Sequence, residues 1–172
     1  MLIEGEPLPS NCVELLGNGS FETGALWPWL TDGPAGLGPG RLSAHGAWLG
    51  GSNNSQSELF QTLTIPAGAP SATWGFWWKA EAASAQPGDR LVIRLEYDGG
   101  EPALKELTAA GPLNTWQYDS VSLTPYAGHH VRIDFLAATD GAVPTTFRID
   151  DTSVRDCHET TQTAPGLVPP GN

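Results

Sequence analysis

Positive charge is scarce in this sequence of 172 residues, which has 8 Lys and Arg residues against 19 Asp and Glu residues and a formal net charge of −11. Nucleic-acid-binding proteins neutralise phosphates with Lys and Arg, so this charge argues against a nucleic-acid partner. It equally argues against docking on an anionic membrane surface. No stretch approaches the roughly 20 apolar residues of a transmembrane helix, so we expect no membrane span.

Cysteine is also scarce: Cys12 and Cys157 are the two in the sequence, and they bracket nearly all of its patterned part. No Cys-x-x-Cys motif or Cys/His cluster indicates zinc. Two cysteines so placed can join the first and last strands of one domain, and such bonds persist outside the cytosol; the alternative is two unrelated thiols. Residues 1–10 lack the basic and apolar regions of a signal peptide. We therefore expect a piece of a longer extracellular or cell-surface protein in preference to a cytoplasmic one.

Catalytic motifs are missing as well. The sequence has no GxSxG or HExxH motif, and no spacing identifies the facing carboxylate pair of a glycosidase. His129 and His130 are adjacent in a predicted turn before a strand. Neighbouring strand residues point to opposite faces, which makes these two a poor metal pair. We expect no enzymatic activity.

Glycine and proline are abundant, with 21 and 15 residues, and they cluster in short segments that separate apolar or alternating runs. Turn signals that recur at roughly 8 to 15 residues, without a convincing amphipathic helix, predict an all-β sandwich or barrel. The Thr/Pro/Gly-rich end of the chain is typical of a linker. The expected organisation is a leader over residues 1–11, one β domain over residues 12–157 and a tail or linker over residues 158–172.

Alternation predicts which side chains face the core. In the run RLVIRLEY, Leu91, Ile93, Leu95 and Tyr97 share one face, whereas Arg94 and Glu96 lie on the other. In TWGFWWKA, Trp74, Phe76 and Trp78 belong to the apolar face, which leaves Trp77 on the opposite one. In SELFQTLTI, Gln61 falls on the face of Leu59 and Leu63, where a buried polar group needs a partner.

Five segments in order carry a resemblance to a known family. They are NGSFETG (18–24), AHGAWLGG (44–51), LFQTLTIPAGAPSATWGFWWKA (59–80), LTPYAGHHVRIDF (123–135) and FRIDDTSV (147–154). In this order they resemble bacterial jelly-roll modules of the galactose-binding-like superfamily, with calcium-containing carbohydrate-binding modules and MAM-like modules as the nearest types. The resemblance implies a jelly-roll β-sandwich of two antiparallel sheets with a disulfide between the chain ends.

The resemblance also implies a structural Ca²⁺ ion near the meeting point of the first and last strands. The matching positions are Glu22 and one or both of Asp150 and Asp151, with backbone carbonyl groups near Asn18 and residues 45–46. Calcium takes six to eight oxygen ligands from carboxylates and carbonyls, so the residue types fit. The alternative is that these are solvated carboxylates of an acidic chain.

Three tryptophans are candidate ligand contacts. Trp27 and Trp29 flank Pro28 in a Gly/Pro-rich loop, and loops often carry binding residues. Trp77 is the outward aromatic of its strand, and we expect Arg94 and Glu96 to be its polar partners on the same sheet face. The alternative for Trp27 and Trp29 is that they plug one end of the sandwich. An aromatic ring can pack against the C–H face of a pyranose while polar groups bind its hydroxyls.

These features predict a non-catalytic binding module of a secreted or cell-surface protein, with carbohydrate as the leading ligand class and adhesion as the setting. The alternative is a structural or self-associating subunit, or a spacer, of an extracellular surface assembly without a glycan ligand. Its partners would then be other domains of a longer chain or copies of itself.

Overall fold

The computed structural model describes residues 11–158, and its elements are almost all strands. In chain order they are β1 (Asn11–Glu14), β2 (Leu30–Asp32), β3 (Ala35–Gly38), β4 (Gly46–Gly50), β5 (Gln56–Thr64), β6 (Ala72–Glu81), β7 (Gln86–Glu96), β8 (Ala103–Ala109), β9 (Gln117–Ser122), the 3₁₀ turn η1 (Thr124–Tyr126), β10 (His130–Ala138) and β11 (Thr146–His158). Among these residues no helix is long and apolar enough to cross a membrane.

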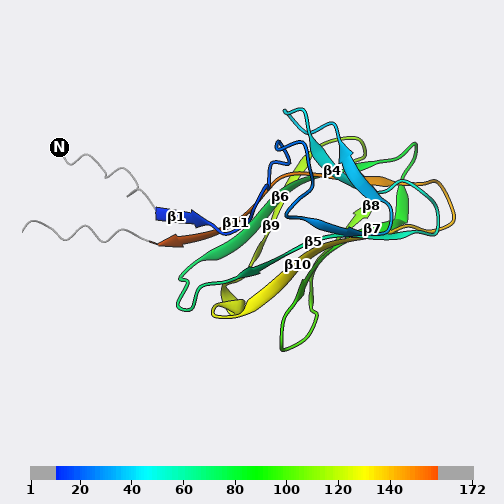
Figure 1. Ribbon diagram of the computed structural model, residues 1–172. Helices are drawn as coiled ribbons and strands as arrows, with labels where there is room; N and C mark the ends of the chain where they lie inside the picture. The colour runs from blue at the N-terminus through cyan, green and yellow to red at the C-terminus, as the bar shows by residue number, and fades with distance from the viewer. Residues whose placement is uncertain (1–10, 159–172) are drawn as a thin grey trace, which may run out of the picture.

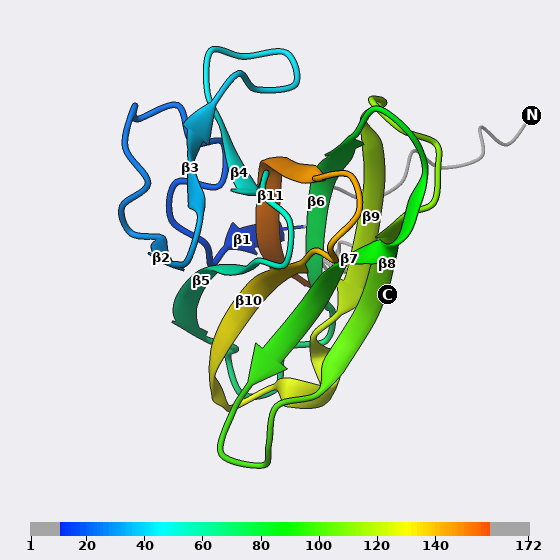
Figure 2. The ribbon, with the colours of Figure 1, turned by 90° about the vertical axis from the view of Figure 1, so that its right-hand side faces the viewer.

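The strands form two antiparallel sheets that face each other (Figures 1 and 2). The six-stranded sheet has the order β3-β4-β11-β6-β9, with β1 added to β11, and the five-stranded sheet has the order β2-β5-β10-β7-β8. The predicted all-β jelly-roll sandwich is therefore confirmed. The predicted leader and tail lie outside the described residues, except that Asn11 begins β1 and His158 ends β11.

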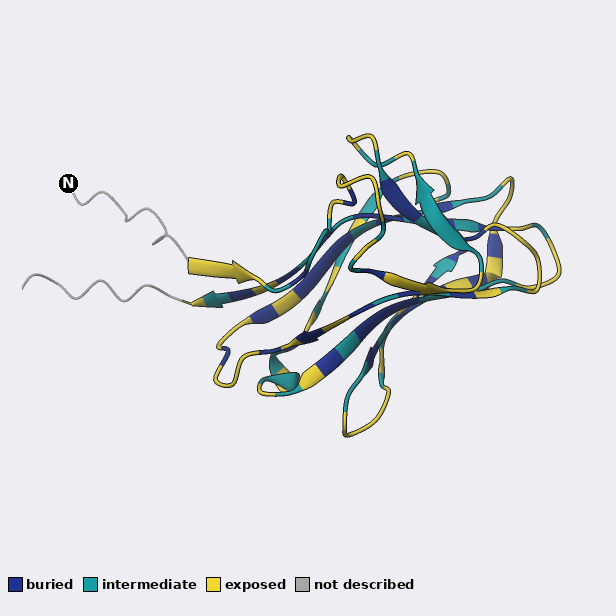
Figure 3. Ribbon diagram, viewed as in Figure 1, coloured by how far each residue is buried: buried dark blue, intermediate teal, exposed yellow. Residues whose placement is uncertain are grey.

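Buried positions lie along the strands of both sheets (Figure 3). The core that they form contains several aromatic rings. Trp74 and Phe76 of β6 meet Phe135 of β10 at centroid distances of 4.9 and 5.2 Å, both edge-on. Aromatic pairs of this kind contribute about 0.5–1.5 kcal/mol each beyond their burial. The Trp74 indole N–H donates to the hydroxyl of Thr152 at 3.0 Å, so this buried donor is satisfied.

The predicted alternation is confirmed on β5, β6 and β7, including the polar exception. Gln61 is buried on the apolar face, as expected, and its carboxamide finds its partners on Gly17. Its Oε1 accepts from the Gly17 N–H at 2.8 Å, and its Nε2 donates to the Gly17 carbonyl at 3.0 Å. The side chain thus fixes the start of the loop that leads to β2.

Strand β11 connects distant parts of the chain. Its first half pairs with β4, most of its length pairs with β6, and its last four residues pair with β1. A bulge between Asp150 and Ser153 interrupts the β6 pairing, and Asp151 has a φ of 44° there. The β1 pairing places Cys12 opposite Cys157, and the two form the predicted disulfide. Strands β1 and β11 project together from one end of the sandwich (Figure 1).

Loss of this disulfide is expected to lower stability substantially. The bond joins residues that are 145 positions apart, and the chain-entropy model assigns about 5 kcal/mol to closing so long a loop. We expect the double variant Cys12→Ser/Cys157→Ser to lose up to about 5 kcal/mol of unfolding free energy, measured by guanidinium titration. A reductant should bring the wild type to the variant's midpoint and leave the variant unchanged. Equal midpoints for the oxidised wild type and the variant would contradict the expectation.

Candidate functional site

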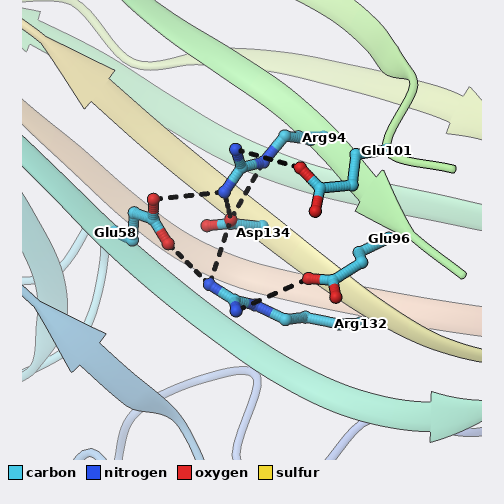
Figure 4. Close-up of polar contacts among 6 residues, drawn as sticks. All are labelled: Glu58, Arg94, Glu96, Glu101, Arg132 and Asp134. Atoms are coloured by element: carbon cyan, nitrogen blue, oxygen red, sulfur yellow. Dashed lines mark hydrogen bonds and ion pairs between the residues drawn. The ribbon is translucent and has the colours of Figure 1, made fainter.

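The outward residues of β5, β7 and β10 form a charged surface on the five-stranded sheet (Figure 4). Because neighbouring positions of a strand alternate, the inward residues between them fill the core. The strand register places Asp134 between Phe60 and Arg94, and Arg132 between Thr62 and Glu96. We call the cluster of Glu58, Arg94, Glu96, Arg132 and Asp134 on this surface, with Glu101 from the loop after β7, the charged face.

Asp134 lies at the centre of the charged face, and its side chain is only 1% exposed. Its Oδ2 accepts hydrogen bonds from Nε and Nη2 of Arg94 and lies 3.4 Å from Nη2 of Arg132. Glu58 bridges the same two guanidinium groups, with its Oε1 at 3.1 Å from Nη2 of Arg94 and its Oε2 paired with Nη2 of Arg132. Carboxylates on neighbouring strands therefore hold both guanidinium groups in place.

Two further carboxylates lie at the rim of the charged face. Glu96 is 3.6 Å from Nη1 of Arg132, and Glu101 is 3.9 Å from Nη1 of Arg94. Their side chains are 45% and 58% exposed, in contrast to the 16% of Glu58. The face thus combines deep, fixed charges with accessible acceptors, and its carboxylates outnumber its guanidinium groups.

Burial sets the protonation behaviour of the central pair. Desolvation raises the pKa of Asp134 to about 6, although its hydrogen bond and charge interaction with Arg94 oppose the shift. The Oδ1 atom of Asp134 is buried without a hydrogen-bond partner among residues 11–158. This burial agrees with a raised pKa of Asp134. Desolvation acts to lower the pKa of Arg94, but its bond and charge interaction with Asp134 outweigh it, so that pKa is raised.

Aromatic rings and a surface hollow adjoin these charges. The Arg132 guanidinium lies 3.6 Å from the centroid of the Phe60 ring, a cation–π geometry. Tyr97 is held by edge-on contacts of 5.2 Å with both Tyr126 and His129. A hollow of about 490 Å³ lies beside Tyr97 and Arg132. It is lined chiefly by Thr62, Glu96, Tyr97, Asp98, His130 and Arg132.

Exposed apolar side chains continue from the charged face onto β2 and the loop before it. Leu30 lies opposite Phe60 in the strand register and is 50% exposed. Trp27 is 74% exposed, the most exposed tryptophan named as a candidate ligand contact. Its role as a ligand contact stays a prediction, and its exposure is compatible with one.

Trp77 and its predicted polar partners are not on the same face, and that prediction was wrong. Trp77 belongs to β6 of the six-stranded sheet, whereas Arg94 and Glu96 belong to β7 of the five-stranded sheet. Alternation assigned each side chain to the outside correctly, but it does not tell which of two sheets a strand joins. Arg41 covers the Trp77 ring at 4.2 Å, and Tyr118 contacts it edge-on at 5.6 Å.

Trp29 was also misassigned as a ligand contact. It is 2% exposed and packs between Phe21 and Phe135, at centroid distances of 5.8 and 6.0 Å. Its indole N–H donates to the carbonyl of Asn18 at 3.2 Å. The alternative reading, in which this tryptophan plugs the sandwich, describes Trp29 but not the exposed Trp27.

Oxygen atoms converge where the loop between β3 and β4 meets β11. The Ser43 hydroxyl lies 3.1 Å from both the His45 carbonyl and Oδ2 of Asp150. Glu22 accepts the backbone N–H of His45 at 2.7 Å. That bond is the main cause of the lowered pKa of Glu22, and a hydrogen bond to Ser43 adds to it. Burial raises the pKa of Asp150, although the Arg41 N–H opposes the shift.

Two of the predicted calcium ligands are engaged elsewhere. The carboxylate of Asp151 pairs with the Arg41 guanidinium at 2.9 Å. The backbone carbonyl of Asn18 accepts the Phe21 N–H and the Trp29 indole N–H, both at 3.2 Å. Within the described part of the chain no three His, Cys, Asp or Glu side chains are grouped to hold a metal. A cation at the oxygen cluster would therefore use Glu22 and Asp150 together with neutral oxygens, a donor set that suits calcium.

The sequence contained a signal for the charged face that the prediction did not use. Two alternating runs each present charges of both signs outward, Arg94 with Glu96 and Arg132 with Asp134. Opposite charges directly across neighbouring strands stabilise their pairing, so these runs could have been matched as adjacent strands. Glu58 and Phe60 on β5 would then have completed the face.

Comparison with family models finds no match, and a search of curated proteins finds none either. Among solved structures, the chain is similar to the carbohydrate-binding module TmCBM61 in complex with β-1,4-galactotriose. The identity is 20%, the TM-score is 0.64, and the match covers 83% of this chain and 97% of that one. A family 16 carbohydrate-binding module matches at 20% identity and a TM-score of 0.59, over 81% of this chain and 98% of that one.

The enzymatically active domain of tailspike protein 4 from bacteriophage CBA120 is also similar, at 15% identity and a TM-score of 0.57. That match covers 82% of this chain but only 21% of the tailspike chain. At such identities the likeness establishes the fold, a β-sandwich shared with carbohydrate-binding modules.

The raised pKa of Asp134 predicts a defined pH dependence. Burial raises the pKa of Asp134 to about 6 from its ordinary value of 3.8, so the folded protein binds this proton more tightly than the unfolded chain does. The stability that the protonated form contributes is complete below that lower pKa and is lost as the pH rises through the upper one. We expect the unfolding free energy of the wild type, minus that of Asp134→Asn, to fall by at most about 3 kcal/mol between about pH 4 and pH 7. Urea titrations measure it, and a difference that rises with pH would contradict the assignment.

Proposed function

We propose that this domain is a non-catalytic module that binds a neutral carbohydrate through the charged face. The observation that carries the proposal is the array of fixed donors and acceptors across β5, β10 and β7, next to a hollow and two partly exposed aromatic rings. The similarity of the fold to carbohydrate-binding modules supports the ligand class.

Sugar hydroxyls both donate and accept hydrogen bonds, so a saccharide needs both kinds of partner at fixed positions. The guanidinium groups of Arg94 and Arg132 supply donors, and the exposed oxygens of Glu96 supply acceptors. Because the deep carboxylates already hold these arginines, less side-chain entropy is lost when a ligand binds. The excess of carboxylates on the face disfavours an acidic sugar and favours a neutral one.

The setting we propose is a secreted or cell-surface protein, in which this module holds a larger chain on a glycan. The Cys12–Cys157 disulfide supports an oxidising compartment. The net charge of −11 supports a partner other than nucleic acid.

Filling the hollow, or removing a charged acceptor from its lining, is expected to weaken glycan binding without unfolding the domain. The ligand is identified on an array that includes β-1,4-linked galacto-, xylo- and gluco-oligosaccharides, and its affinity is measured by calorimetry. Thr62 is exposed beside the hollow, so Thr62→Tyr fills the space, and Glu96→Gln removes a charged acceptor. We expect each variant to bind at least about tenfold more weakly, since one lost charge-assisted hydrogen bond contributes about 1.5–3 kcal/mol.

Ser52→Tyr, on the opposite sheet side of the domain, serves as the matched control and should bind normally. Normal binding by both Thr62→Tyr and Glu96→Gln would place the ligand elsewhere. An array without any neutral glycan signal, together with concentration-dependent self-association in sedimentation, would favour the structural alternative.

We also propose that the oxygen cluster formed by Glu22, Ser43, His45 and Asp150 holds a structural Ca²⁺ ion. The cluster brings two carboxylates and a carbonyl oxygen around one hydroxyl, which has a single proton to share among them. A cation would neutralise the buried Asp150 carboxylate and tie the β3–β4 loop to β11. Of the two neighbouring aspartates, Asp150 suits this role because Asp151 is paired with Arg41.

Calcium is expected to raise the thermal stability of the domain. A ligand present at a hundred times its dissociation constant adds about 2.7 kcal/mol to the unfolding free energy. Melting curves in millimolar CaCl₂ and in EDTA should therefore differ by several degrees for the wild type and for Asp151→Asn. The difference should vanish in Asp150→Asn and should not appear with Mg²⁺. A wild-type melting temperature that EDTA leaves unchanged would contradict the calcium proposal.

A further inference from the structure

A second hollow lies on the six-stranded sheet, lined by residues of β3, β4 and β11 and the loops beside them. These three strands are neighbours in that sheet (Figure 2). The volume of the hollow is about 560 Å³, within the range of small-molecule sites in proteins. Its chief lining residues are Pro34, Leu37, Pro39, Trp48, Ser52 and Arg148. Among the described residues that line it there is no carboxylate, and Arg148 is the one charged residue.

The Trp48 ring is fixed at this hollow by a hydrogen bond and by a glycine. Its indole Nε1–H donates to the Leu37 carbonyl at 3.1 Å. The ring lies against Gly36, where an added Cβ would come within 2.9–3.0 Å of three of its atoms. The ring is partly exposed at the surface of the hollow. The Trp48 ring is therefore already ordered before a ligand binds, and little side-chain entropy is lost in ordering the ring.

Arg148 lies opposite Trp48 in the strand register and has unused donor capacity. Its Nε pairs with Glu81, which also accepts Lys79 at 3.3 Å, so one carboxylate faces two cations. Neither Nη atom of Arg148 has a hydrogen-bond partner among residues 11–158. Nη1 is buried, which leaves Nη2 as the atom available to a ligand.

The two sides of the sandwich therefore differ in charge. Carboxylates are in excess on the charged face, whereas the described lining of the hollow at Trp48 has a cation and an aromatic ring but no carboxylate, and Glu81 contacts that cation from outside the lining. A guanidinium group binds a carboxylate more strongly than a neutral acceptor, and the ring suits the C–H face of a sugar.

We propose that this hollow is a second binding site, selective for a sugar that carries a carboxylate, with the acid on Arg148 and the ring of the sugar on Trp48. The proposal takes its ligand class from the proposed function but uses different residues, on the opposite sheet.

Acidic monosaccharides test the site directly. The probes are D-galacturonate, D-glucuronate and N-acetylneuraminate. The methyl ester of D-galacturonate, which has no charge, is the control for D-galacturonate. Binding is followed by the ¹H–¹⁵N signal of the Trp48 indole. We expect at least one acid to shift this signal saturably, and its affinity to fall at least tenfold in Arg148→Gln and in Ser52→Tyr. For galacturonate, we expect the methyl ester to bind at least tenfold more weakly.

Ser52 is exposed at the hollow, so Ser52→Tyr blocks the site without removing the Arg148–Glu81 pair and guards against a misfolded Arg148 variant. Thr62→Tyr on the charged face should bind the acids normally, which separates this site from the neutral-glycan site. The proposal is overturned if none of the three acids shifts the indole signal at about 50 mM, or if folded Ser52→Tyr binds an acid as the wild type does.

Discussion

The structure depends on the pairing of β11 with three other strands. This strand runs beside β4, β6 and β1, and antiparallel pairing fixes which residues face the core and which face solvent. It contributes Phe147, Ile149 and Val154 to the core. Asp150, at the edge of its bulge, belongs to the oxygen cluster, Arg148 lines the second hollow, and Cys157 ties the last strand to the first. A slip of one position would turn all of these to the wrong face.

Burial of charge organises the other sheet. Asp134 and Glu58 are more deeply covered than the rim carboxylates, and their pairing with Arg94 and Arg132 leaves both guanidinium groups fixed before a ligand arrives. A buried ion pair is weak evidence for stability, because desolvation offsets its attraction. A role in presenting donors and acceptors to a ligand accounts better for so many charges on one face. The same domain has a hollow beside Arg148 whose described lining residues include no carboxylate, so its two sides differ in charge.

The positions of Cys12 and Cys157, together with the resemblance to jelly-roll modules, predicted the sandwich and the pairing of the terminal strands. Alternation and turn chemistry predicted an all-β sandwich or barrel, the inward faces of β5, β6 and β7 and the partner requirement of Gln61. They were not enough to place residues relative to one another across sheets. Trp77 and Arg94 both face outward, but from different sheets, because strand order depends on long-range topology that a local period of two does not encode. Trp27 and Trp29 both flank Pro28, yet Trp29 is core and Trp27 is exposed, which local sequence does not distinguish.

Chemical-shift mapping with a neutral oligosaccharide tests the central claim, that the charged face binds carbohydrate, most directly. Saturable shifts are expected at Thr62, Glu96, Tyr97 and Arg132, with the side-chain signals of Arg94 included, and none at the Trp48 or Trp77 indoles. Shifts confined to the six-stranded sheet, or to the loop that carries Trp27, would contradict it.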